Sequence, residues 1–180
     1  MLRPHASEGP MLGFLFRGLT AEPARGTALF DALTAQTRQP HWYVEGKVPD
    51  TLDGRFAVLA TLTALTLVRV EADGESGNPL SVGLSERFIE VMESEHRELG
   101  LGDPTLGKTV RKLVGMLARR TERWRAACGG EGDWFEATRE SLYKSDVDPD
   151  ALRHSGEALR SLWNHLSATA PVALGKGQIA

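Results

Sequence analysis

The sequence predicts an all-α protein, organised as a single compact domain of about six helices with a loose N-terminal arm. Three observations carry this prediction. Apolar residues between positions 105 and 126 recur at the spacing of one helix face. The segment 56–70 is apolar on every side and about four turns long, which is typical of a helix buried at a domain centre. Glycine and proline separate these segments, and 180 residues suffice for one sizeable core.

The N-terminal half of the chain is expected to contain two of these helices. Residues 1–25 hold several prolines and glycines and are predicted to form the loose arm. A short helix is predicted over 27–38. The next stretch, "QPHWYVEGKVPDTLDG", is interpreted as a loop that Trp42 and Tyr43 anchor to the core. The buried helix 56–70 follows and leads into an exposed loop.

The C-terminal half is expected to contribute four more helices. Glycines separate the first two, and Asp148 followed by Pro149 is typical of the start of the last one. The helical domain would then span 26–168, and a loose tail would follow over 169–180. The four helices are expected over 81–99, 105–126 and 134–143 and from Pro149 onward.

Composition and charge argue against several classes of site. The formal net charge of −3 argues against bulk binding of nucleic acid, and no DNA partner is expected. Cys128 is the one cysteine, and the five histidines are scattered. His96, His154 and His165 are interpreted as ordinary surface or boundary residues. The longest uncharged apolar run has 13 residues, whereas a membrane span needs about 20. We therefore expect a cytoplasmic protein with no metal site, no cofactor and no catalytic residues.

The stretch "GDPTLGKT", residues 102–109, matches the phosphate-binding pattern G-x-x-x-x-G-K-T. A phosphate-binding loop follows a buried strand, but the preceding segment is charged and helical in period. The backbone N–H groups of a phosphate-binding loop must hold the phosphates, and Pro104 has no backbone N–H. We therefore interpret Gly100 and Gly102 as the end of one helix and Asp103 as the start of the next. A nucleotide-binding protein remains the alternative.

Basic residues are concentrated in the predicted helix 105–126 and form a stripe opposite its apolar face. One interpretation is a solvated surface whose charge is balanced by the acidic helix 81–99. The other is a contact with an acidic partner such as RNA or lipid headgroups, and a nucleic-acid-binding helical protein is a further alternative. The candidates for this contact are Lys108, Arg111, Lys112, Arg119 and Arg123.

Two sequence blocks together resemble a known family. "QPHWYVEGKVPDTLDGRF" precedes the long apolar helix, and "HRELGLGDPTLGKTVRKLVGMLARRTERW" contains a glycine-rich turn that leads into the basic helix. In this order and spacing, over residues 28–143, they are similar to the ubiquinol–cytochrome c chaperone family. The resemblance also accounts for the match to a phosphate-binding loop, which would be an accident of this turn.

The resemblance implies an all-helical, non-catalytic factor for the assembly of ubiquinol–cytochrome c reductase. By analogy it would bind newly made cytochrome b, and its partners would include the ribosome, a small helical protein and the membrane surface. The basic stripe then becomes a candidate contact with the ribosome or the membrane. Asp50 and Asp53 could instead cap the helix that follows them. The expected scaffold or client-binding residues are Pro49, Asp50, Asp53, Gly54, Arg55, Gly100, Gly102, Asp103 and Gly107.

Overall fold

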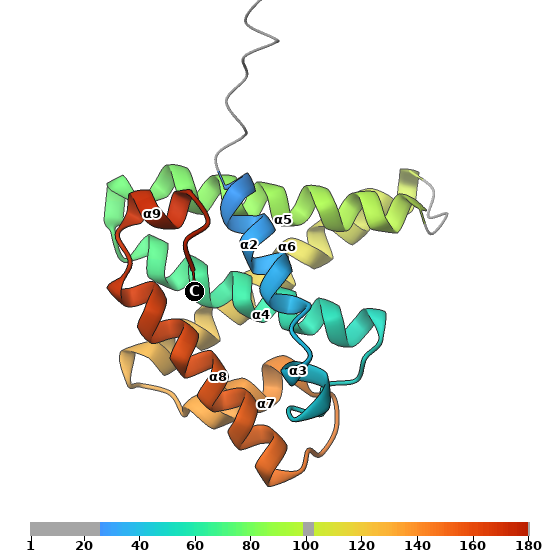
Figure 1. Ribbon diagram of the computed structural model, residues 1–180. Helices are drawn as coiled ribbons and strands as arrows, with labels where there is room; N and C mark the ends of the chain where they lie inside the picture. The colour runs from blue at the N-terminus through green and yellow to red at the C-terminus, as the bar shows by residue number, and fades with distance from the viewer. Residues whose placement is uncertain (1–25, 99–102, 180) are drawn as a thin grey trace, which may run out of the picture.

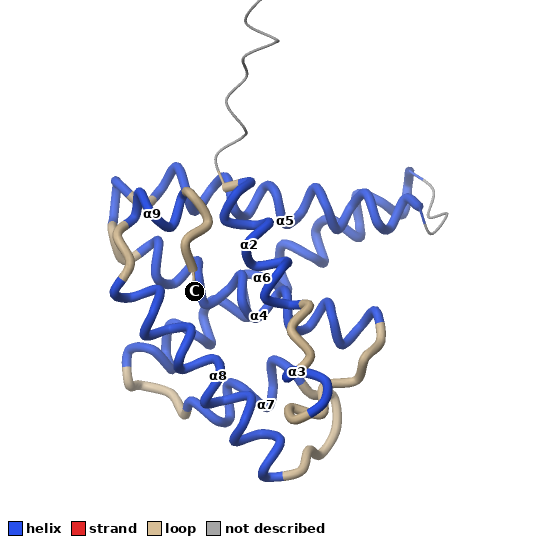
Figure 2. Tube along the Cα trace, in the orientation of Figure 1, coloured by secondary structure: helices blue, strands red, loops and turns tan. Residues whose placement is uncertain are grey.

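The computed structural model describes residues 26–98 and 103–179, and within these ranges it contains helices and no strand (Figures 1 and 2). The prediction of an all-α protein is confirmed. The arm predicted over 1–25 and the turn residues Gly100 and Gly102 lie outside the described ranges. The helices are α2 (Thr27–Thr37), α3 (His41–Val44), α4 (Leu52–Glu71), α5 (Asn78–Glu98), α6 (Asp103–Gly129), α7 (Trp134–Leu142), α8 (Pro149–Ala168) and α9 (Pro171–Gly175), with a 3-10 turn, η1, at Gly74–Ser76.

Helix α4 lies at the centre of the molecule and packs against α2, α5, α6, α7 and α8 (Figure 1). From Val58 to Val70 every residue except Arg69 is buried, as the apolar composition predicted. The buried hydroxyls of Thr61 and Thr66 donate to carbonyl oxygens one turn earlier, at 2.7 and 2.8 Å. These bonds let polar side chains lie inside the core without water.

Helices α5 and α6 pack against α4 and against each other. Leu84 and Phe88 of α5 and Leu117 and Trp124 of α6 are buried, as their periodicity predicted. Val114 was assigned to the same face of α6 but is 45% exposed. It lies at the margin of the buried face, so its side chain reaches solvent.

Two segments have more structure than predicted. The stretch expected to be a loop contains α3, because Pro40 sets the helical backbone and Trp42 buries its ring and donates to the Gln36 carbonyl oxygen at 3.0 Å. The tail expected over 169–180 contains α9, which packs against α2. Leu174 and Ile179 of this segment are buried in the core.

The start of α4 is fixed by a close backbone approach at Gly54. A Cβ atom added there would lie 1.9 Å from the Pro49 carbonyl oxygen. Because the obstacle is backbone of the adjoining turn, no side-chain rotation can relieve it. Gly54 therefore fixes how the chain enters the central helix.

Gly54→Ala should lower the free energy of unfolding by about 3 kcal/mol, because the new methyl group must displace backbone. Gly107→Ala is the matched control: it is also a helical glycine, but a Cβ there meets no atom within 4 Å. The control should be neutral or gain up to about 1 kcal/mol. Urea denaturation followed by circular dichroism measures both, and equal stabilities of the two variants would contradict this role of Gly54.

Candidate binding surfaces

Side chains from the predicted motif meet at the first turn of α4. Thr51 is the N-cap, and its hydroxyl accepts from the Gly54 N–H at 3.2 Å, so the expectation that Asp50 or Asp53 caps the helix is wrong. Asp50 instead accepts from Arg55 at 2.7 Å. Asp53 bonds a lysine of the α7–α8 connection, and this hydrogen bond holds the pKa of its carboxyl below the ordinary value.

Three hollows surround this first turn, and Phe56 lines all of them. The α2-side hollow, of about 490 Å³, lies between the starts of α3 and α4 and the end of α2. The α7-side hollow, of about 570 Å³, lies between α4, α6 and the end of α7. The α6-side hollow, of about 260 Å³, lies between α4, α5 and α6. Elements distant in sequence therefore form one broad concave region at one end of the central helix.

The α2-side and α6-side hollows share an apolar lining. Leu52 is 60% exposed and Met92 is buried, and both line the two hollows. Val44 adds a further exposed apolar side chain, and Met116 lines the α6-side hollow. Flexible methionine beside exposed aliphatic residues suits a surface that accepts apolar segments of varied shape. Glu95 is exposed and lines both hollows.

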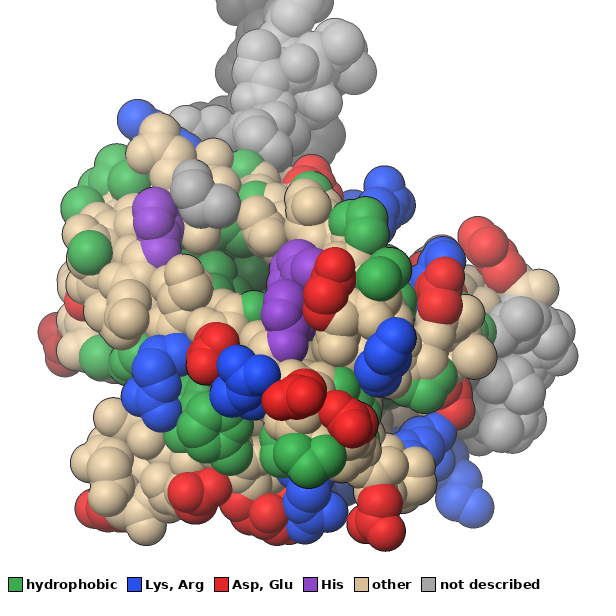
Figure 3. Space-filling view, turned by 60° about the horizontal axis from the view of Figure 1, so that its bottom comes forward, with side chains coloured by type: hydrophobic (Ala, Val, Ile, Leu, Met, Phe, Trp, Pro, Cys, Tyr) green, Lys and Arg blue, Asp and Glu red, His purple; other side chains and the backbone are tan. Residues whose placement is uncertain are grey.

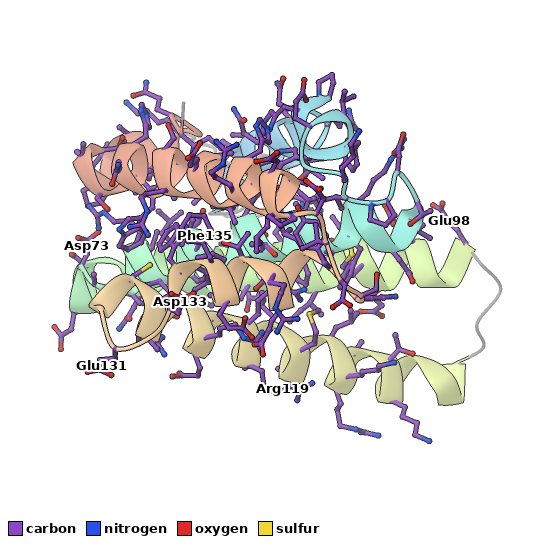
Figure 4. All side chains as sticks on the ribbon, turned by 90° about the horizontal axis from the view of Figure 1, so that it is seen from below. Asp73, Glu98, Arg119, Glu131, Asp133 and Phe135 are labelled. Atoms are coloured by element: carbon purple, nitrogen blue, oxygen red, sulfur yellow. The ribbon has the colours of Figure 1, made fainter. Side chains whose placement is uncertain are left out.

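The exposed side of α6 carries the predicted basic residues. Figure 4 shows Arg119 on the side of α6 that faces away from α7 and α8. Arg123 does not belong to this surface, because it pairs with Glu140 of α7 at 2.6 Å. Lys112 also lines the α6-side hollow, so the two surfaces share an edge. We define the basic face as the four exposed cations of α6 that have no ion pair within the described ranges: Lys108, Arg111, Lys112 and Arg119.

The stretch that matches a phosphate-binding loop lies between two helices. Helix α5 ends at Glu98 and α6 begins at Asp103, so a helix precedes the turn where a nucleotide-binding loop would follow a strand. Gly107 is exposed inside α6, and its surroundings leave room for a side chain. No close approach requires a glycine there, so the expected scaffold role of Gly107 has no support in the packing.

A histidine pair joins α3 to α8. The Nδ1 atom of His41 lies 3.1 Å from Nε2 of His154, and adjoining histidines are visible near the centre of the face in Figure 3. His154 is half-buried, as expected of a boundary residue, but it has a partner 113 positions away that the sequence spacing did not indicate. Burial and then His154 lower the pKa of His41, while Glu45 acts in the opposite direction.

Catalytic and metal chemistry find little support in the described residues. Burial raises the pKa of Cys128 to about 12, so its thiol stays protonated at neutral pH. Residues 26–98 and 103–179 contain no group of three or more histidine, cysteine, aspartate or glutamate side chains that could hold a metal ion. In the same ranges no helix has the length and hydropathy needed to cross a bilayer.

Comparison with known proteins assigns the chain to a family. The model of the ubiquinol-cytochrome C chaperone family matches residues 44–180, which include the start of α4 and the basic face. The chain belongs to this family. The crystal structure of the Cbp3 homolog from Brucella abortus is similar, with 25% sequence identity and a TM-score of 0.76 over 94% of this chain and 95% of that one. No curated protein sequence matches the chain. The family consists of non-catalytic assembly factors, and membership confirms that the chain is not an enzyme.

Sequence reasoning missed several residues of these surfaces. In the sequence, Phe56 and Met92 look like ordinary core residues. They line hollows because neighbouring helices end beside them, and the sequence does not show where those ends lie in space. His41 gave no signal, because its partner lies on a distant helix. Arg120 did give one, because it falls within the apolar stripe of α6, four residues before the buried Trp124.

The histidine pair should make stability depend on pH. Because the pKa of folded His41 lies below its ordinary value of 6.5, the unfolded chain binds the proton first. The stability due to neutral His41 is therefore present above about pH 6.5 and is lost as the pH falls towards the lower, folded pKa. His41→Gln should lose less stability than the native chain between about pH 7.5 and 5.5. Urea denaturation at several pH values measures this, and His165→Gln, an exposed histidine of α8, is the control that should keep the native dependence.

Proposed function

We propose that this protein is a chaperone that assists assembly of ubiquinol–cytochrome c reductase by binding newly made cytochrome b. The observation that carries the proposal is the family match over residues 44–180, together with the fold shared with the Cbp3 homolog along almost the whole chain. A chaperone of this kind needs a surface that covers apolar client segments and no catalytic group.

The concave region at the start of α4 is the part of the chain best suited to the client. An unassembled membrane protein exposes apolar segments, which aggregate unless another apolar surface covers them. Leu52 and Val44 offer exposed apolar area there, and Met92 and Met116 can adapt to different side chains. Charged residues at the rim, such as Glu95 and Lys112, keep the empty surface soluble.

The basic face is the candidate contact with a phosphate-bearing surface, either ribosomal RNA or lipid headgroups. Its four cations are exposed and have no ion pair with the residues that the structure describes, so they are available to an external anion. Because Lys112 lies at the edge of both surfaces, a chain docked through α6 would hold the concave region close to the anionic surface. A newly made membrane protein is found beside both kinds of surface. A small helical partner protein would then occupy a different part of the chaperone.

Deletion of the gene should selectively reduce the b-type haem signal of ubiquinol–cytochrome c reductase in membranes. The reason is that newly made cytochrome b would not be incorporated into the enzyme without its chaperone. Difference absorbance spectra of b-type and c-type haem in membranes from deleted and complemented cells measure the effect. Normal spectra together with normal reductase activity would rule out the proposed function for this chain.

Charge reversal on the basic face, Lys108→Glu with Arg119→Glu, should weaken binding to an anionic surface. Each cation near such a surface contributes about 1 kcal/mol, so loss of the two cations alone should weaken binding roughly thirtyfold, and repulsion by the two new carboxylates should weaken it further. Co-sedimentation with ribosomes and with vesicles of anionic phospholipid, each at two salt concentrations, shows which surface is recognised. Lys176→Glu is the control, since Lys176 is an exposed cation outside α6 and has no ion pair among the described residues. Unchanged binding to both surfaces, with native helical content, would contradict a role for the basic face.

A further inference from the structure

Arg120 of α6 is a partly buried cation that has no ion pair with any carboxylate in residues 26–98 and 103–179. Its guanidinium donates to two neutral acceptors, the Met116 sulfur and the Ser141 carbonyl oxygen, and its Nε has no hydrogen-bond partner. A guanidinium offers five N–H groups, so donors remain for another acceptor. Burial, followed by the charge of Arg123, lowers the pKa of Arg120 to about 10. The side chain therefore stays charged at neutral pH, and a desolvated charge without a partner is unfavourable.

The α7-side hollow contains a second polar group without a partner. Arg120 and Ser141 both line this hollow of about 570 Å³. Ser141 is only 2% exposed, and its hydroxyl oxygen has no hydrogen-bond partner. Buried polar groups in folded proteins are nearly always satisfied. Two unsatisfied groups beside the same hollow therefore point to a polar ligand that binds there.

The acidic side chains around the hollow do not neutralise Arg120. Asp146 is exposed and acts instead on Arg139, whose pKa it helps to raise. The other three are engaged elsewhere, so the cation lacks a counter-charge within the described part of the chain. Asp53 bonds Lys144 and Glu140 bonds Arg123, each at 2.6 Å, and Asp148 accepts from the backbone N–H groups of Asp150 and Ala151 in the first turn of α8.

The walls of the hollow are mainly apolar around this charged floor. Such a lining disfavours a small, fully hydrated anion and favours a ligand that brings apolar surface with its charge. Lys47 and Lys144 also line the hollow and are exposed, and Lys144 pairs with Asp53. The apolar wall residues are Phe56, Ala57, Met116, Leu142 and Val147.

We infer that the α7-side hollow binds a carboxylate attached to a small apolar group, with the carboxylate on the guanidinium of Arg120 and the apolar group between Phe56 and Leu142. A guanidinium matches a carboxylate in charge and in planar shape. The carboxylate could belong to the end or an acidic side chain of an apolar polypeptide segment, or to a free fatty acid. The inference stands on this hollow alone and does not require that the client is cytochrome b.

The test uses the full chain and three small probes: N-acetyl-leucine, its uncharged amide and octanoate. Isothermal titration calorimetry should show that N-acetyl-leucine binds at least about tenfold more tightly than the amide, because only the acid can neutralise the cation. Octanoate carries the same carboxylate on a longer chain. Tighter binding of octanoate would assign the site to a fatty acid, and tighter binding of N-acetyl-leucine would assign it to a polypeptide.

Arg120→Met keeps the volume of the side chain and removes its charge, so it should reduce the affinity for both acids by about tenfold or more. Ala57→Leu fills the apolar wall without touching Arg120 and serves as the second variant if Arg120→Met does not fold. Arg153→Gln removes an exposed arginine of α8 outside the hollow and should bind as the native chain does. Equal binding of the acid and its amide, or unchanged affinity in both Arg120→Met and Ala57→Leu, would overturn the inference.

Discussion

The enclosure of α4 by five other helices is the packing constraint on which the rest of the structure depends. A helix that is apolar on every face must be covered on every side, and each large side chain buried in this way contributes about 1.5–3 kcal/mol. The covering helices come from both halves of the chain, so neither half can complete the core alone. Threonine hydroxyls that bond carbonyl oxygens within the same helix remove the need for polar neighbours.

The same constraint explains where the binding surfaces lie. Val58 is fully buried, whereas Leu52, less than two turns earlier, is 60% exposed, so the enclosure ends at the first turn of α4. At that level the chain segments around α4 change direction, and their ends leave hollows that helix packing does not fill. The turn itself is held by Thr51 as N-cap and by the backbone contact at Gly54. A rigid helix start surrounded by hollows can present apolar surface without weakening the core.

Periodicity in the sequence was sufficient to predict the long helices, because each is several turns long and has one apolar face. It could not predict α3, whose four residues are too few to show a period, nor α9, whose Leu174 is buried only because α2 lies beside it. The capping residue of α4 was missed because Asp50, Thr51 and Asp53 are all suitable types, and backbone geometry alone selects Thr51. The hollows depend on how the ends of several helices meet, which no local pattern encodes.

Helix α6 carries two kinds of cation with different physical meaning. Arg119 and its neighbours on the basic face are hydrated, so their lack of partners costs little and is compatible with an ordinary solvated surface. Arg120, one residue further on, is largely desolvated and has no counter-charge in the part of the chain that the structure describes, so its position is unfavourable unless a ligand compensates it. Salt should separate the two, because screening weakens contacts between exposed charges far more than contacts inside a hollow. A partner that engages both faces of α6 would therefore lose its outer contact at high salt and keep the inner one.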